Sequence, residues 1–217
     1  MKKANTLVKL EKSGVIAVLR AESKEMALRT IDAVVQGGIT GLEITFTIPD
    51  AESVIKETVS AYQNNSDIVI GAGTVLDVIT ARIAIMSGAE FIVSPAFDQD
   101  IAELCNLYQV PYLPGCMTVT EMTAALRSGV DIIKLFPSNH FEPGFINAIK
   151  APLPQVNIMP TGGINLDNIE QWVTAGSVAV GVGGSLFAPA KHGNYTKVTQ
   201  IAKEYIDKFN EIKMVCQ

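Results

Sequence analysis

Short apolar runs alternate with amphipathic stretches along the whole chain. The apolar runs are rich in Val and Ile, are apolar on both faces and mostly end in Gly, Pro or Thr, which is typical of parallel strands covered on both sides. We expect eight such strands, at residues 14–20, 41–46, 67–74, 90–96, 111–116, 131–137, 157–163 and 177–184.

A stretch with helical spacing of its apolar residues follows each expected strand. Ser23 stands at the N-cap of the first of these helices and Asp50 at that of the second, where a short polar side chain can accept a backbone N–H. The expected helices cover residues 23–36, 51–62, 77–87, 100–109, 118–128, 142–150, 165–175 and 194–213.

Eight strand–helix units without a linker predict a (β/α)8 TIM barrel with an N-terminal helix, and they place residues 1–217 in a single domain. A doubly wound open sheet is the alternative architecture. It is disfavoured because no GxGxxG follows the first strand and because eight evenly spaced units suit closure into a barrel. In such barrels the active site lies at the C-terminal ends of the strands.

Composition and charge narrow the class of protein. A net charge of −5 and a pI of about 5.1 argue against a basic surface for nucleic acid or for an acidic membrane. Cys105, Cys116 and Cys216 fit no disulfide framework, which predicts a reducing cytoplasm. The chain starts without the apolar core of a signal peptide and no apolar run approaches the ~20 residues of a membrane span. We therefore expect a soluble cytoplasmic protein.

A lysine interrupts the apolar sixth strand, DIIKLFP. Lys134 shares one face of this strand with Ile132 and Phe136, because side chains two residues apart point the same way. A buried ammonium is costly unless it is paired or loses its proton. Lys134 therefore either makes a structural ion pair, or keeps its head group in water, or acts as a neutral amine that condenses with a ketone to form a Schiff base.

Glu43, in LEIT of the second strand, is the carboxylate available at the same level of the barrel. In one interpretation it only neutralises Lys134 or Arg20, and in the other it moves protons as a general acid–base group. Both roles need the same position, so the residues alone leave both open. The presence of this partner favours chemistry at Lys134, and the two form the candidate catalytic pair.

Glycine pairs end two neighbouring strands, in PTGGIN and VGGSLF. The loops after strands 7 and 8 often bind phosphate in these barrels, because glycine lets backbone N–H groups approach an anion. One Gly-Gly pair alone indicates only a tight turn, but two pairs on the expected strands predict a phosphate site. The candidate substrate-binding residues at these two strand ends are Thr161, Gly162, Gly163, Gly184 and Ser185.

Arg20 ends the first strand and Thr74 ends the third. A guanidinium that faces the barrel mouth can hold a substrate carboxylate through two hydrogen bonds, and we expect Thr74 to reach the same group. His140, in the loop after the sixth strand, could touch substrate, although a surface role is the simpler interpretation. His140 and His192 lie far apart in the sequence, and we expect no metal site.

Seven motifs follow one another in the chain: LEITFTIPDA, GAGTV, FIVSPAFD, YLPGCMTVTE, IIKLFPS, PTGGINLDNI and VGVGGSLF. Together and in this order they resemble the 2-keto-3-deoxy-6-phosphogluconate (KDPG) aldolases and the related 4-hydroxy-2-oxoglutarate (KHG) aldolases. The resemblance runs from about residue 10 to the end of the chain. It implies a class I aldolase that assembles as a homotrimer of (β/α)8 barrels and needs neither a metal nor a cofactor.

The resemblance also implies a reaction and roles for single residues. The substrate would be a phosphorylated keto acid, KDPG, cleaved reversibly to pyruvate and D-glyceraldehyde 3-phosphate. Lys134 would form the Schiff base and Glu43 would shuttle protons. The remaining residues that the resemblance assigns are Thr74, Pro95 and Phe136 around the pyruvyl group, and Gly162, Gly163, Gly184 and Ser185 around the phosphate.

One position departs from the family pattern. Many members carry an arginine soon after the catalytic glutamate, in a sequence like E-x-T-x-R-T, where this chain has Thr47. If that arginine helps to hold the substrate anion, either its role passes to Arg20 here or the affinity for the substrate drops. The loop NHFEPGF that follows KLFPS also differs, and this loop could change which aldehyde fits.

Several other functions stay open at this point. KHG cleavage to pyruvate and glyoxylate and cleavage in the 6-phosphogalactonate series are alternatives within the same chemistry. A sugar-phosphate epimerase or isomerase on the same barrel would keep the phosphate loops without needing a lysine on the sixth strand. A non-catalytic binding protein would take up a phosphorylated sugar acid without releasing pyruvate.

Overall fold

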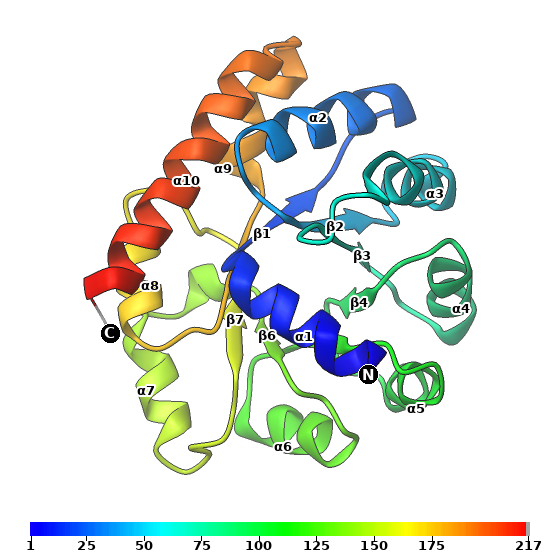
Figure 1. The fold of residues 1–217 in the computed structure, drawn as a ribbon. Helices are drawn as coiled ribbons and strands as arrows, with labels where there is room; N and C mark the ends of the chain where they lie inside the picture. The colour runs from blue at the N-terminus through cyan, green and yellow to red at the C-terminus, as the bar shows by residue number, and fades with distance from the viewer. Residues whose placement is uncertain (216–217) are drawn as a thin grey trace.

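Eight parallel strands form the centre of the protein, and helices cover the strands on the outside (Figure 1). The structure is a computed structural model that describes residues 1–215, so Cys216 lies outside the described residues. The strands are β1 (Val15–Leu19), β2 (Gly41–Thr45), β3 (Val69–Gly73), β4 (Phe91–Ser94), β5 (Tyr112–Cys116), β6 (Ile133–Leu135), β7 (Ile158–Pro160) and β8 (Val180–Val182).

The helices alternate with the strands along the chain. Two 3-10 turns, η1 (Ser138–His140) and η2 (Ala188–His192), follow β6 and the short helix α9. The α-helices are α1 (Lys2–Ser13), α2 (Lys24–Gln36), α3 (Ala51–Tyr62), α4 (Val78–Met86), α5 (Gln99–Leu107), α6 (Val119–Arg127), α7 (Gly144–Lys150), α8 (Ile169–Thr174), α9 (Gly184–Phe187) and α10 (Tyr195–Val215).

The strands pair in the order β7-β6-β5-β4-β3-β2-β1-β8, and every neighbouring pair is parallel. A parallel bridge between Thr161 and Gly181 brings β7 next to β8. The Val178 N–H also donates to the Ile158 carbonyl at 3.0 Å. The sheet is therefore nearly closed, and the predicted (β/α)8 TIM barrel with its N-terminal helix is confirmed.

Short polar side chains begin several helices, as capping chemistry requires. The Ser23 hydroxyl accepts the Met26 N–H at 3.2 Å, which confirms the predicted cap of α2. The prediction for Asp50 is wrong. Asp50 precedes α3 but takes a left-handed backbone with φ of 54°, and its side chain accepts no capping hydrogen bond. An N-cap normally has an extended backbone, which aims the side chain at the first turn.

The predicted helix at 165–175 starts later than expected, at Ile169. The Asn165 side chain accepts the backbone N–H groups of Asp167 and Asn168 at 2.9 and 3.1 Å. These bonds hold residues 165–168 in a turn, because an Asn side chain competes with the helix for backbone donors. The loop after β7 therefore keeps an irregular course beside the barrel mouth.

Two apolar layers hold the barrel together, one inside it and one between the strands and the helices. Ile133 and Leu135 face the outer layer, whereas Ile132 faces the interior, as the two-residue period of the strand predicts. The inner layer, called the apolar floor below, consists of Leu10, Ile16, Val69, Phe91, Val93, Leu113, Ile132, Met159 and Ala179.

Helix α1 lies across the end of the barrel where the strands begin (Figure 1). Its Leu10 is 1% exposed and belongs to the apolar floor. Helix α1 and the floor thus occupy this end of the barrel, opposite the C-terminal ends of the strands. Within residues 1–215, no helix combines the length and the hydropathy that crossing a bilayer requires.

Candidate active site

Lys134 and Glu43 meet inside the barrel, directly above the apolar floor. The Lys134 ammonium lies 3.3 Å from Oε1 of Glu43, and the two residues are 5% and 0% exposed. Lys134 pairs in register with Gly115 and Met159, and Glu43 pairs with Val18 and Gly71. The ion pair thus joins β6 to β2 across the barrel. The prediction that these two residues lie together is confirmed.

The Glu43 carboxylate uses only one of its two oxygens. Within residues 1–215, Oε2 of Glu43 is buried and has no hydrogen-bond partner. Gly73 packs against this carboxylate so closely that a Cβ there would collide with Oε1. A buried polar atom without a partner is rare and often marks function. Oε2 therefore keeps an unused acceptor position inside the barrel.

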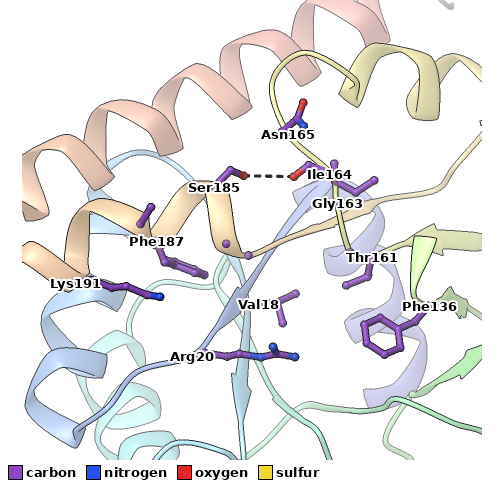
Figure 2. Close-up of a pocket in the computed structure, with 14 residues that line it drawn as sticks. Val18, Arg20, Phe136, Thr161, Gly163, Ile164, Asn165, Ser185, Phe187 and Lys191 are labelled. Carbon is purple, nitrogen blue, oxygen red and sulfur yellow. Dashed lines mark hydrogen bonds between the residues drawn. The ribbon is translucent and has the colours of Figure 1, made fainter. Parts of the chain in front are cut away.

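A cavity of about 510 Å³ lies at the barrel mouth beside the ion pair, although neither Lys134 nor Glu43 belongs to its lining. Phe136 lines this cavity, and its ring centroid lies 5.0 Å from the Lys134 ammonium. Val18, the register partner of Glu43, lines it as well. Figure 2 shows the cavity residues, which are Val18, Arg20, Phe136, Thr161, Gly162, Gly163, Ile164, Asn165, Gly183, Gly184, Ser185, Phe187, Ala188 and Lys191.

Most of the predicted substrate-binding residues line this cavity. The structure brings together residues from the ends of β1, β6, β7 and β8 that are far apart in the sequence. Gly162 and Gly163 have φ values of 101° and 78°, which only glycine adopts without strain. The predicted residues found here are Arg20, Phe136, Thr161, Gly162, Gly163, Gly184 and Ser185.

Three predicted substrate-binding residues, like Lys134 and Glu43, lie outside the lining of this cavity. The Thr47 hydroxyl is 2.7 Å from that of Thr45, at an exposed position after β2. Thr74 has a left-handed backbone with φ of 55°, which is strained for a β-branched residue and is often found at functional sites. The Pro95 carbonyl packs against Gly115, the register partner of Lys134. Thr74 and Pro95 thus follow β3 and β4, near the ion pair.

Arg20 and Thr74, which are expected to serve one group, do not line the same cavity. Arg20 lies in the cavity beside the loops after β7 and β8, whereas Thr74 is not part of that lining. In the sheet, β1 is the direct neighbour of β8 and is separated from β3 by β2. Arg20 therefore lies beside the strand end that carries Gly184 and Ser185.

The Ser185 hydroxyl is already engaged. It lies 2.8 Å from the Tyr205 hydroxyl and donates to the Ile164 carbonyl at 3.4 Å (Figure 2). Tyr205 is fully buried on α10, and burial raises the pKa of its phenol, so the phenol remains protonated. Ser185 therefore lines the cavity as predicted, but its hydroxyl connects the loops after β7 and β8 to α10 instead of standing free.

Lys191 is the charged cavity residue that the sequence did not reveal. It belongs to η2, in the segment APAKHGN between the last strand and the long final helix. No periodic pattern or glycine pair marks this lysine in the sequence. Phe187, the last residue of α9, is 6% exposed and also contributes to the cavity wall.

Other reactive side chains lie away from the cavity. His140 is exposed at the end of η1 and is absent from the lining. Burial raises the pKa of the Cys105 and Cys116 thiols to about 12, so both are protonated near neutral pH. Among the described residues, no three His, Cys, Asp or Glu side chains come together in a group that could hold a metal ion.

The KDPG and KHG aldolase model matches residues 7–201. The 2-dehydro-3-deoxy-phosphogluconate aldolase of Treponema pallidum is 34% identical over 200 residues, which cover 90% of this chain and 93% of the relative. The 2-dehydro-3-deoxy-6-phosphogalactonate aldolase of Escherichia coli is 32% identical over 197 residues, covering 90% of this chain and 94% of the relative.

A solved structure with the same architecture contains a covalent intermediate. The KDPG aldolase of Legionella pneumophila, with pyruvate captured as a covalent carbinolamine, is 28% identical and has a TM-score of 0.82. The match covers 94% of this chain and 97% of that structure. The barrel, the order of its motifs and these matches lead to one conclusion: the chain belongs to the KDPG and KHG aldolase family.

Proposed function

We propose that this aldolase cleaves KDPG reversibly to pyruvate and D-glyceraldehyde 3-phosphate, with Lys134 as the Schiff-base residue. The observation that carries the proposal is the buried contact of 3.3 Å between the Lys134 ammonium and Glu43, beside a cavity that is open to solvent. A structural ion pair would not need a cavity next to it. The relatives from Treponema pallidum and Legionella pneumophila, which are named as KDPG aldolases, support the same substrate.

Imine formation uses the ion pair first. Lys134 transfers a proton to Oε1 of Glu43, its partner at 3.3 Å, and the neutral amine attacks the C2 ketone. Glu43 then returns the proton to the hydroxyl group of the carbinolamine, which leaves as water. The product is a protonated imine whose positive charge draws electrons from C3.

Carbon–carbon cleavage uses Glu43 in its deprotonated form, which imine formation has restored. The carboxylate accepts the proton of the C4 hydroxyl, and Oε2 is free to do so. The C3–C4 bond breaks, its electron pair forms the enamine, and the aldehyde leaves with its new carbonyl at C4. Glu43 then protonates the enamine carbon, and hydrolysis of the imine releases pyruvate and restores Lys134.

Borohydride reduction in the presence of pyruvate tests this chemistry. We expect irreversible inactivation and a mass increase of one reduced pyruvyl group on the peptide that contains Lys134. Lys134→Met should give no adduct. The matched control is Lys197→Met, at an exposed position on α10 outside the cavity, which should be trapped like the wild type. Full activity after treatment, without an adduct, would exclude the Schiff-base mechanism.

A panel of oxoacids identifies the substrate. Pyruvate release is measured with KDPG, with the 6-phosphogalactonate epimer and with KHG, and the values of kcat/KM are compared. We expect KDPG to have the highest value. A preference for the epimer would match the Escherichia coli relative named for that series, and a preference for KHG would mean that the phosphate is not recognised. An epimerase would form no borohydride adduct and release no pyruvate.

We also propose that residues 1–217 act as one domain in a cytoplasmic homotrimer. An exposed apolar face on α4 supports the assembly, because Ile79, Ile83 and Met86 lie along one side of the helix at 74%, 36% and 70% exposure. Burial of this face against another copy would remove it from water. Sedimentation should show a trimer, and Ile79→Lys should dissociate it.

A further inference from the structure

The cavity carries a charge opposite to that of the whole protein. The chain has a net charge of −5, but the charged residues in the lining are Arg20 and Lys191, and the lining contains no Asp or Glu. Figure 2 shows both cationic side chains directed toward the same interior, across from Phe136 and Thr161. This local excess of positive charge attracts an anion that lies at a distance from the Lys134–Glu43 pair.

The backbone of Lys191 is held in place while its side chain is free. Ala190, the preceding residue, is 3% exposed, and its carbonyl accepts the Gly193 N–H at 2.9 Å. The Asn194 N–H donates to the Pro189 carbonyl at 3.1 Å. Across residues 1–215, the Lys191 ammonium makes no hydrogen bond or ion pair, and neither does the Arg20 guanidinium. Both cations are therefore available to a ligand.

Other lysines of the chain differ from Lys191 because their ammonium groups have partners. Lys3, Lys9 and Lys24 pair with carboxylates, and Lys150 and Lys208 donate to backbone carbonyls. A cation without a partner beside a cavity costs little when the cavity is empty and gains most when an anion enters. This arrangement is what a binding residue requires.

We propose that Lys191 is a specificity-determining residue that, with Arg20, selects substrates whose distal end carries a phosphate dianion. This inference rests on the proposed aldolase function. A phosphate monoester carries about −1.5 to −2 charges near pH 7, so two cations match it better than one. Lys191 supplies a compact point charge and Arg20 a planar fork of donors, which together can contact different phosphate oxygens. A distal hydroxyl or a single carboxylate gains less from the pair.

Lys191→Met tests the proposal with two substrates that differ only in the distal phosphate. For KDPG, we expect kcat/KM to fall about tenfold, through KM, because one partly exposed charged contact is lost. For unphosphorylated 2-keto-3-deoxygluconate, kcat/KM of the variant should stay within about twofold of the wild-type value, since other residues bind the rest of the substrate. Lys191→Arg should keep the preference, and Lys197→Met is the control for the loss of a surface charge. Equal losses on both substrates, or no loss on either, overturn the proposal.

A binding measurement separates this inference from the proposed reaction. Titration calorimetry with 3-phosphoglycerate needs no turnover, and Lys191→Met should weaken binding about tenfold while Lys197→Met should not. Raised salt should weaken binding to the wild type more than to the variant, because Lys191 is exposed and screened. The wild type could bind this probe and yet give no borohydride adduct and no pyruvate. The proposed reaction would then be refuted, whereas the proposed anion site would be supported. Equal affinity in the wild type and Lys191→Met refutes the anion site.

Discussion

Replacing Lys134 by Met removes the charge while keeping most of the apolar stem. Glu43 is fully buried, its Oε1 loses the ammonium at 3.3 Å, and Oε2 has no partner within residues 1–215. At an effective dielectric constant of about 20, two unit charges at this distance attract by about 5 kcal/mol. Breaking a buried pair by removing one partner costs about 3–5 kcal/mol. We expect Lys134→Met to lower the free energy of unfolding by about 3–5 kcal/mol and to abolish aldolase activity.

The double variant Lys134→Met/Glu43→Met separates this electrostatic cost from a loss of packing. With both charges gone, no uncompensated ion remains, and replacing a buried pair by apolar side chains is often neutral or stabilising. The double variant should therefore recover most of the stability lost by Lys134→Met, even though it stays inactive. The coupling energy between the two substitutions should amount to several kcal/mol, since the residues are in direct contact.

Urea unfolding at neutral pH measures these differences. Trp172, the single tryptophan, is 3% exposed on α8 and reports on the packing around the barrel, while circular dichroism follows the helices. Coincident transitions from the two signals justify a two-state free energy for each variant. If Lys134→Met loses less than about 1 kcal/mol and the losses of the single variants simply add, the pair is not a coupled buried ion pair. The reasoning from burial would then be wrong.

Three further substitutions test other parts of the site and the fold. Gly73→Ala should lower kcat for pyruvate release at least about tenfold and cost about 1–3 kcal/mol, because its Cβ would displace the Glu43 carboxylate; unchanged kcat would contradict that contact. Tyr205→Phe should cost about 1 kcal/mol in urea unfolding, since the Ser185 hydroxyl loses a bond of 2.8 Å; unaltered stability would count against it. Glu121→Gln should cost about 1 kcal/mol at neutral pH by weakening the capping box of α6. Backbone hydrogen bonds lower the pKa of Glu121, so its contribution is present above the unfolded-state pKa and fades as the pH falls through the folded one; a difference that persists in acid would argue against this origin.

The barrel could be predicted because its signals are local and repeated. Each strand is a short apolar run and each helix has its own spacing, so the eight units appear in the order of the chain. The boundaries were less certain. The Asn165 turn delayed α8, and the left-handed backbone of Asp50 removed a predicted cap, because side chains there compete for backbone groups in ways that spacing does not reveal.

The candidate site was predictable where a residue conflicts with its surroundings. Lys134 and Glu43 are charged residues in apolar strands, and such a conflict points to pairing or chemistry. Lys191 conflicts with nothing, since a lysine in a polar loop is ordinary, and only the closing of β8 next to β1 brings it near Arg20. The contact of the Ser185 hydroxyl was likewise not predictable from the sequence, because its partner Tyr205 comes from the distant final helix.

The position of the apolar floor bears on the order in which the two products leave the enzyme. Helix α1 and the floor occupy one end of the barrel, and the cavity beside the Lys134–Glu43 pair lies at the other. In the proposed mechanism, the three-carbon fragment would stay bound to the Lys134 amine, and the phosphorylated fragment would lie nearer the barrel mouth. The aldehyde therefore departs first and pyruvate last. In steady-state inhibition studies, pyruvate should compete with the sugar acid for the vacant enzyme, whereas the triose phosphate should inhibit non-competitively.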